Sequence, residues 1–384
     1  MKKTLIAAAA AVALTASAFA DITFGSWLRT LPTFVASNGD DTVAYATNSW
    51  GGSARTARIQ FSAAAEDGNA GFDMMIFDPM SGDLSDSGSA RMWVKPVEQV
   101  KLSVGSFSPD NNVGGYRRDF AYGAWNWVRS YSTWITDGEG YLIDGVGDWS
   151  YPSAAASGHR TGALVEVTPV EGLNAYAFVP FAADGSAILA EDTYKMIQIG
   201  GNYAIDGVGL LSAVFIGAND KDPAGDVTKT GTIEAAFELT SVENLYVGAG
   251  FKMPIQDADK VAADADKMAL KLAVSYQVNA DAKVYANGGY YMYNKGKDDA
   301  GKDPRFEAAV GVDYNLGDGL SANVDVRYTS KTNDADNSDN VGLLAGVTKG
   351  ISSNGLIGIA FQGKTNGNGD KFIWGIPVRV EMWF

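Results

Sequence analysis

Residues 372–384 read FIWGIPVRVEMWF. From Ile376 onward, apolar residues recur at every second position and alternate with charged or amphipathic ones. Successive side chains of a β-strand point to opposite faces, so this period predicts a strand with one apolar and one polar face. The apolar register is Ile376, Val378, Val380, Met382 and Phe384, and the other register is Pro377, Arg379, Glu381 and Trp383.

The same alternation recurs upstream. In the clearest case, residues 320–328, apolar positions such as Val324 and Val326 alternate with Asp325 and Arg327. A tilted strand of about ten residues suffices to cross a bilayer. Further strands of this kind are predicted at residues 58–63, 232–239, 268–278 and 305–316.

The connections between these segments alternate in length. Eight are short and rich in turn residues, and nine longer polar stretches separate them, which predicts about eighteen antiparallel strands. Sixteen is the alternative if two weaker pairs, near Met92 and near Leu173, are misread. The short turns are predicted at residues 67–69, 96–98, 169–171, 206–207, 241–243, 279–281, 317–319 and 352–354, and the long connections are centred near Gly39, Asp83, 108–159, Gly185, Asp222, Asp259, Asp298, Asp336 and Asn368.

Such a sheet has a physical reason to close. In hydrocarbon an unpaired backbone amide costs several kcal/mol, so a sheet that crosses a membrane must have no edge. A closed sheet of this many strands is too wide for side chains to fill, so its inner register is expected to be wet and charged. The predicted lumen-wall residues are Arg58, Arg91, Lys101, Asp325, Arg327, Arg379 and Glu381, joined in the same register by Glu166, Glu234, Glu238, Lys271, Glu307 and Asp313.

Aromatic residues near strand ends fit the girdles that membrane barrels place at both interfaces. The predicted girdle residues are Trp27, Trp93, Tyr203, Tyr246, Tyr314, Tyr328 and Trp374.

The first twenty residues have the pattern of a secretory signal peptide. Lys2 and Lys3 precede an apolar run that is too short to span a bilayer, and Ala18-Phe19-Ala20 forms an A-x-A cleavage site. We therefore expect residues 1–20 to be removed and residues 21–384 to form a single barrel domain. The sequence contains no Cys, which excludes disulfides and thiolate metal sites.

The charge and the amino-acid composition limit the classes of partner that we expect. The formal net charge is −15, so nucleic acid, which requires a basic face, is not an expected partner. The 45 glycines and the 11% aromatic content suit a membrane barrel, in which only alternate residues meet lipid.

With these features the chain resembles a Gram-negative outer-membrane porin, an all-β transmembrane antiparallel barrel of 16–18 strands. The resemblance implies short periplasmic turns, long extracellular loops, an outer-membrane location in contact with lipid, a homotrimer, and passive diffusion of small hydrophilic solutes. The final strand is similar to the C-terminal signal through which the barrel assembly machinery recognises and inserts such proteins. Phe384, Met382 and Val380 are its candidate residues.

Residues 108–159 form the longest connection, and connections of such length are usually functional. In porins a long loop commonly folds into the lumen and constricts it, and this loop is the natural candidate here. Packing against the wall or a trimer contact remains the alternative role for its aromatic residues. Candidate constriction residues are Arg117, Arg118, Asp119, Arg129, Asp137 and Glu139, and candidates for stacking on saccharides are Tyr116, Trp125, Trp127 and Trp134.

Catalytic motifs are missing from the sequence. The one histidine, His159, has no accompanying nucleophile motif, and there is no phosphate-binding loop, so we expect no enzyme activity and no cofactor. Acidic stretches at Asn219, Asp220, Asp222 and Asp226 and at Asp334, Asp336 and Asp339 leave weak Ca²⁺ binding open, although neither completes a twelve-residue calcium loop.

The sequence thus predicts a channel for passive diffusion and leaves selectivity for saccharides open. The net charge favours cations at the pore mouth, but the three arginines of residues 108–159 could reverse this preference locally. A barrel-anchored surface adhesin or antigen and an exported soluble β-protein are the alternatives.

Overall fold

The computed structural model describes residues 19–30, 33–37, 39–40, 42–44, 57–77, 89–107, 160–181, 197–221, 227–256, 268–292, 305–330, 339–365 and 371–384. Residues 1–18 of the predicted signal peptide and the whole of the predicted loop 108–159 lie outside these ranges. No helix within them is long and apolar enough to cross a membrane.

The regular elements in the described ranges are all β-strands. They are β1 (Phe19–Thr30), β2 (Thr33–Ser37), β3 (Thr42–Ala44), β4 (Ala57–Ala65), β5 (Ala70–Phe77), β6 (Ser89–Val97), β7 (Val100–Phe107), β8 (Arg160–Val170), β9 (Leu173–Pro180), β10 (Gln198–Ile205), β11 (Gly209–Lys221), β12 (Val227–Leu239), β13 (Leu245–Gln256), β14 (Met268–Gln277), β15 (Ala282–Met292), β16 (Arg305–Gly317), β17 (Leu320–Thr329), β18 (Asn340–Ser352), β19 (Gly355–Thr365) and β20 (Phe372–Trp383).

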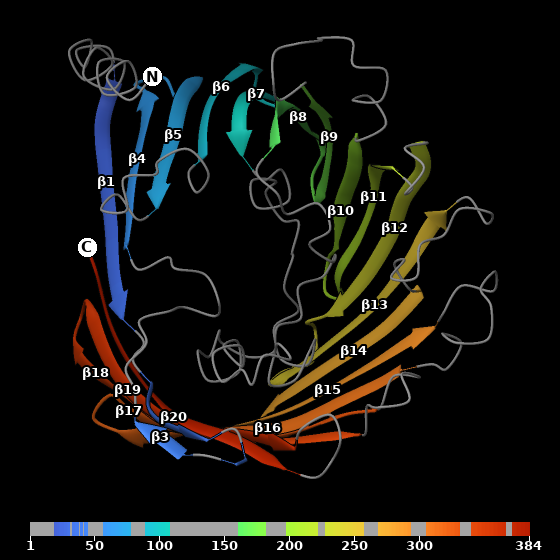
Figure 1. Ribbon diagram of the computed structural model, residues 1–384. Coiled ribbons are helices and arrows are strands. Elements are labelled where there is room, and N and C mark those ends of the chain that lie inside the picture. Colours follow the sequence, from blue (N-terminus) through green and yellow to red (C-terminus); the bar gives the residue numbers. More distant parts are fainter. Residues whose placement is uncertain are drawn as a thin grey trace.

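The strands form a closed barrel of 18 antiparallel strands (Figure 1). From β4 to β20 each strand pairs with the next, and β1 pairs with β20 on one side and with β4 on the other. β1 and β2 count as one barrel strand because both pair with β20, and Pro32, which has no backbone N–H, stands between them in the sequence. The predicted strand number of about eighteen is confirmed, and both weaker pairs are present as β6–β7 and β8–β9.

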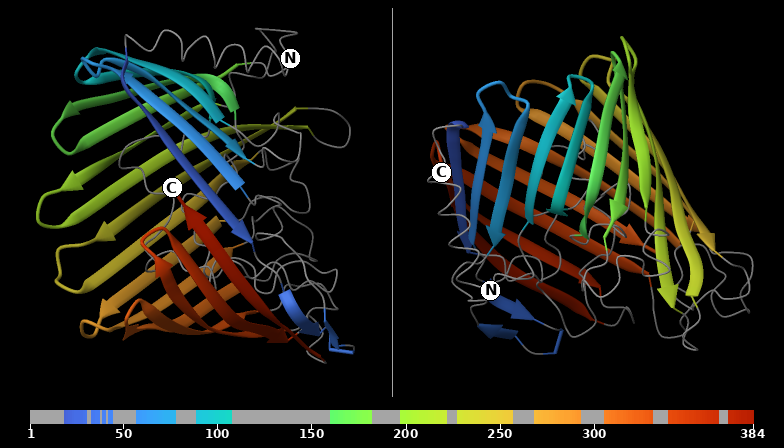
Figure 2. Two further views of the ribbon diagram at one scale, coloured as in Figure 1. Left: turned by 90° about the vertical axis from the view of Figure 1, so that its left-hand side faces the viewer. Right: turned by 90° about the horizontal axis from the view of Figure 1, so that it is seen from above.

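The closure involves the last residue of the chain. The backbone N–H of Ser26 donates to the carbonyl of Phe384, and the N–H of Phe384 donates to the carbonyl of Ser26, each over 2.8 Å. Figure 2 shows the C-terminal end of β20 meeting β1 part of the way along its length.

The eight short turns all join neighbouring strands at one end of the barrel (Figure 2). Gly68 and Gly207 have φ of 68° and 64°, which glycine adopts without strain. In the first turn Asp67 accepts a hydrogen bond from the N–H of Asn69 over 3.0 Å, and this bond, with a second from the Asn69 side chain, lowers the pKa of Asp67. Two predicted turns are misplaced by about two residues, because β6 continues to Val97 and β8 to Val170.

The two faces of the sheet differ as the alternation predicts. In β20 Met382 is exposed while Arg379 is buried, and Phe384, which follows the strand, is also exposed. In β17 Val324 and Val326 are exposed while Asp325 and Arg327 are buried. Across the barrel the exposed register is apolar and the buried register is rich in polar groups. This is the pattern of a barrel that meets lipid outside and encloses polar groups.

One hairpin was not predicted. β2 pairs with β3 over three residue pairs, in a region that the sequence predicts as the long connection near Gly39. Its tip is joined to the start of β20 by an ion pair between Asp40 and Lys371. A three-residue strand is too short for alternation to reveal.

The girdle prediction is wrong for Trp27, Trp93 and Tyr246. Their registers place them on the same face as Arg58, Lys101 and Glu238, respectively, whereas Tyr203 and Tyr314 are on the exposed face. The physical reason is that these three rings contact charged groups: Arg58 lies 5.5 Å from the Trp27 ring centroid, and the Tyr246 hydroxyl donates to Glu238.

Candidate functional site on the inner face of the barrel

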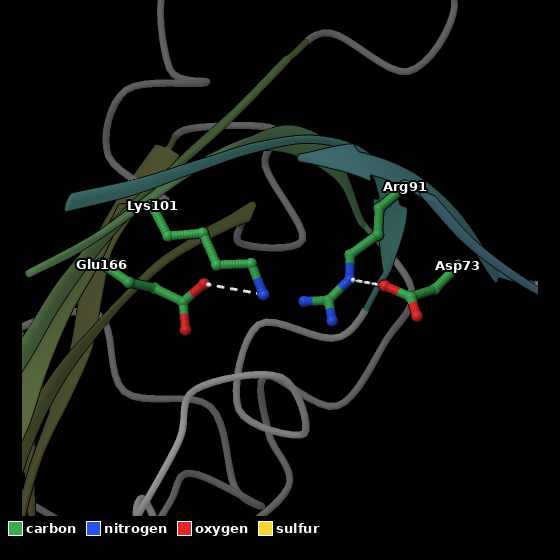
Figure 3. Close-up of polar contacts among 4 residues, drawn as sticks. All are labelled: Asp73, Arg91, Lys101 and Glu166. Carbon is green, nitrogen blue, oxygen red and sulfur yellow. Dashed lines mark hydrogen bonds and ion pairs between the residues drawn. The ribbon is translucent and has the colours of Figure 1, made fainter. Parts of the chain in front are cut away.

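Residues that lie directly opposite each other on neighbouring strands share a face of the sheet. Asp73 of β5 lies opposite Arg91 of β6, and Lys101 of β7 lies opposite Glu166 of β8. Figure 3 shows that these four side chains extend from the concave side of the sheet, which is the inside of the barrel. We call the register that contains them the inner face.

One group of charges on the inner face surrounds Trp93. Arg91 Nε donates to Asp73 Oδ2 over 2.9 Å, while Lys101 Nζ and Glu166 Oε2 form a looser ion pair at 4.0 Å. Lys101 Nζ also lies 4.9 Å from the centroid of the Trp93 ring, and Lys95 Nζ lies 5.6 Å from it. We refer to Asp73, Arg91, Trp93, Lys101 and Glu166 as the Trp93 cluster.

The position of Trp93 depends on a glycine. Gly71 lies opposite Trp93, and a Cβ at Gly71 would come within 2.7 Å of Trp93 Cε2, so the indole lies against bare backbone. The absence of a side chain at Gly71 therefore allows the ring to sit close to the wall, beneath the two lysines.

A second charged group lies on β17 and β20. Arg327 and Asp325 form an ion pair at 3.4 Å with both side chains fully buried, and Arg379 is paired with Glu381. Asp325 lies opposite Gly311, and a Cβ at Gly311 would overlap its carboxylate. The Asp325 carboxylate thus occupies the space that a side chain on β16 would fill.

Hydroxyl groups supply donors to two further carboxylates. The Tyr246 hydroxyl donates to Glu238 over 3.0 Å, and the Tyr285 hydroxyl donates to Asp313 over 2.7 Å. Glu234 is buried on the same strand as Glu238. The inner face therefore carries both signs of charge, on strands from β4 around to β20.

The predicted lumen-wall residues Arg58, Arg91, Lys101, Asp325, Arg327, Arg379 and Glu381 all lie in the inner-face register. Val380, Met382 and Phe384 lie in the opposite, outward register at the end of the chain. The constriction candidates Arg117, Arg118, Asp119, Arg129, Asp137 and Glu139 and the stacking candidates Tyr116, Trp125, Trp127 and Trp134 lie outside the described residues.

Sequence reasoning missed Asp73 and the contacts of Trp93. Asp73 stands in the run Phe72 to Ile76, where Met75 breaks the polar register and hides the alternation. The register between β5 and β6 brings Asp73 opposite Arg91, and no signal in the sequence indicates it, because these two strands are joined by the long connection near Asp83 and not by a short turn.

The acidic stretches show no metal site in the part of the chain that the structure describes, where no group of three or more His, Asp or Glu could hold an ion. Asp339 instead accepts a hydrogen bond from the Tyr328 hydroxyl over 2.8 Å. Asn219 and Asp220 lie in β11, and their backbones pair with β12. The other acidic residues of these stretches lie outside the described residues: Asp222, Asp226, Asp334 and Asp336.

Comparisons with known proteins agree with this geometry. A family model described as outer membrane protein beta-barrel domain matches residues 173–348, which is less than half of the chain. No curated protein matches the sequence.

Solved structures resemble the fold at low identity. Pseudomonas aeruginosa OccK2 (OpdF), in complex with glucuronate, matches with a TM-score of 0.57 at 10% identity, over 96% of this chain and 99% of that one. The outer membrane protein OpdK from Pseudomonas aeruginosa matches with a TM-score of 0.56 at 12% identity, over 96% and 99%. A porin refined at 1.8 Å matches with a TM-score of 0.50 at 13% identity, over 95% and 100%. With its closed barrel and apolar outer register, the chain has a porin-like fold of the kind found in outer-membrane β-barrels.

Proposed function

We propose that this protein is an outer-membrane diffusion channel for small hydrophilic solutes and that it is not an enzyme. The observation that carries the proposal is the division of the barrel into two registers, apolar outside and charged inside. Charged side chains in an apolar core would cost several kcal/mol each, whereas on the wall of a channel they can reach water or pair with one another, as Asp325 and Arg327 do. The number of strands supports the same conclusion, because a barrel of this width encloses space that wall side chains do not fill.

The charge of the lumen supports a preference for solutes that combine polar and ionic groups. The inner face presents cations on β4, β6, β7, β17 and β20 and carboxylates on β5, β8, β12, β16 and β17. Saccharides and sugar acids are the solutes to test first. The aromatic residues proposed for saccharide stacking and the arginines proposed for the constriction both belong to residues 108–159.

We further propose that residues 1–20 are a signal peptide, that Phe384, Met382 and Val380 form the insertion signal, and that the channel is a homotrimer. The reciprocal hydrogen bonds between Ser26 and Phe384 support a role for the last residue in closing the barrel. The trimer rests on the porin-like fold alone.

The experiment is single-channel recording of refolded protein, residues 21–384, in a planar bilayer under a salt gradient. We expect stepwise conductance, in triplets if the protein is trimeric, and the reversal potential reads the ion preference. Current block by added oligosaccharide or glucuronate would identify the solute class. A barrel that inserts and shows heat-modifiable migration on gels but never conducts would refute the channel and favour the surface adhesin.

A further inference from the structure

We propose that the Trp93 cluster is an oxyanion-binding subsite, in which Arg91 and Lys101 together bind the carboxylate or phosphate group of a solute. The inference rests on the proposed channel function, because a solute reaches this part of the inner face through the lumen. It adds to that function the location of a binding site and the chemical class of its ligand.

The first argument is the order of the charges. Figure 3 shows the four ionic side chains in a row, with Glu166 at one end, Asp73 at the other, and Lys101 and Arg91 pointing toward each other in the middle. Each cation has its carboxylate on the outer side, so the two positive groups face each other across the centre of the row. Like charges that point toward each other repel, and an anion placed between them turns the repulsion into two attractions.

The second argument concerns the donors of Lys101. Its 4.0 Å separation from Glu166 is too long for a hydrogen bond, so the pair is held by charge alone. The ammonium group lies over the Trp93 ring, which stabilises a cation but accepts no strong hydrogen bond. The lysine side chain is 24% exposed, so part of it reaches solvent.

Arg91 supplies the complementary half of the site. Its Nε is engaged with Asp73, and Figure 3 shows its terminal nitrogens directed toward Lys101. The bond to Asp73 fixes the plane of the guanidinium, so this group meets an oxyanion in a preset orientation. An oxyanion in the centre would then contact one guanidinium and one ammonium.

The two carboxylates refine the class of solute. Asp73 and Glu166 flank the proposed position of the anion, and both can accept hydrogen bonds from donors on the same solute. They would also repel a second negative charge. The cluster therefore suits a solute with a single anionic group and neighbouring hydroxyl or ammonium groups, and disfavours a polyanion.

The subsite is built from wall residues alone and includes none of the residues of the predicted constriction. Lys101 is the second residue of β7, next to a short turn, whereas residues 108–159 follow the other end of that strand at Phe107. Six residues of strand separate the two positions, which corresponds to about 20 Å. Substitutions in the cluster therefore change wall residues and leave residues 108–159 as they are.

The test is block of single-channel current by inorganic phosphate and, separately, by acetate, with Lys101→Gln and Arg91→Gln as variants. Each variant removes one of two cationic ligands, so we expect the half-blocking concentration to rise roughly tenfold. Lys101→Arg keeps the charge and should retain the block. A response to phosphate alone or to acetate alone would say which oxyanion the site takes.

The matched control is Lys283→Gln. Lys283 is the second residue of β15, next to a short turn, and its Nζ lies 5.3 Å from the Tyr285 ring, so it reproduces the setting of Lys101 on another part of the wall. Its opposite residue is Asp313, which accepts a hydrogen bond from the Tyr285 hydroxyl. If Lys283→Gln and Lys101→Gln raised the half-blocking concentration equally, the block would depend on the overall positive charge of the wall and not on this cluster. That outcome would overturn the site.

Two failures are distinguishable. Absence of any stepwise conductance in the unsubstituted protein would defeat the proposed channel function. Normal conductance without block by either anion would leave the channel intact and defeat only the subsite. Heat-modifiable migration confirms that each variant is folded, and Arg91→Gln decides the matter if Lys101→Gln does not fold.

Discussion

Replacing Gly311 with alanine should destabilise the barrel through a single contact. A Cβ at this position would overlap the Asp325 carboxylate and come within 2.8 Å of its Cγ and 3.0 Å of the Val324 carbonyl oxygen. The carboxyl group would have to retreat by more than about half an ångström to reach an ordinary contact distance. Asp325 and Arg327 are both fully buried, so the movement strains a pair that has no access to solvent.

The size of the effect follows from two contributions. Overpacking by one methyl group typically costs about 1–3 kcal/mol. Disrupting a buried ion pair completely costs about 3–5 kcal/mol, and a displaced carboxylate loses part of that. We therefore expect Gly311→Ala to lower the free energy of unfolding by about 2–4 kcal/mol.

The assay is reversible urea unfolding of the protein folded into lipid vesicles, followed by tryptophan fluorescence. Gly25→Ala is the control, because a Cβ at Gly25 would meet nothing closer than 3.8 Å on the same inner face. That change should be neutral or stabilise slightly, since alanine restricts the unfolded chain.

A double-mutant cycle identifies the contact. In an Asp325→Ala background the clash is gone, so Gly311→Ala should cost much less than it does in the unsubstituted protein. Equal stabilities of Gly311→Ala and Gly25→Ala, or an unchanged cost in the Asp325→Ala background, would refute the reasoning.

Three further predictions concern other contacts. Deletion of Phe384 removes both hydrogen bonds to Ser26 and should lower stability by about 1–3 kcal/mol in the same urea assay, whereas Phe384→Ala keeps the backbone bonds and should change stability less. Tyr246→Phe removes the donor to the buried Glu238 and should cost about 1–3 kcal/mol, while Tyr203→Phe on the exposed face should cost nothing measurable. The pKa of Asp67 is lowered by hydrogen bonds from the backbone and the side chain of Asn69, so its contribution to stability is present above the ordinary pKa and is lost as the pH falls through the lowered value. Titration of the Asp67 carboxyl by NMR checks the direction, and Asn69→Ala, which removes only the side-chain bond, should raise the pKa part of the way.

The fold was predictable because strands that cross a membrane show a simple sequence pattern. Period-two alternation and short turns sufficed to place sixteen of the barrel strands in pairs, since each short turn joins strands that are neighbours in space. The last strand was assigned to the correct faces residue by residue, from Ile376 to Phe384. The hairpin of β2 and β3 escaped because three residues cannot display a period.

The site was less predictable, for a related reason. Alternation assigns a residue to a face of its own strand, but contacts across the face depend on the register between strands. Trp93 illustrates this, because only its position opposite Gly71 and beside Lys101 shows that it belongs with the charges and not with the lipid. Asp73 likewise becomes a partner of Arg91 only once β5 and β6 are aligned.

The way β20 meets β1 bears on how this protein can be labelled. Phe384 pairs with Ser26, and β1 continues for several residues beyond that point, from Gly25 back to Phe19. Residues appended after Phe384 would therefore run alongside Gly25 and the residues before it and would extend the wall. An affinity tag fused at this end would first form an additional length of strand, so it needs a spacer that extends past Asp21, the first residue of the proposed mature chain, before it can be reached by a resin or an antibody.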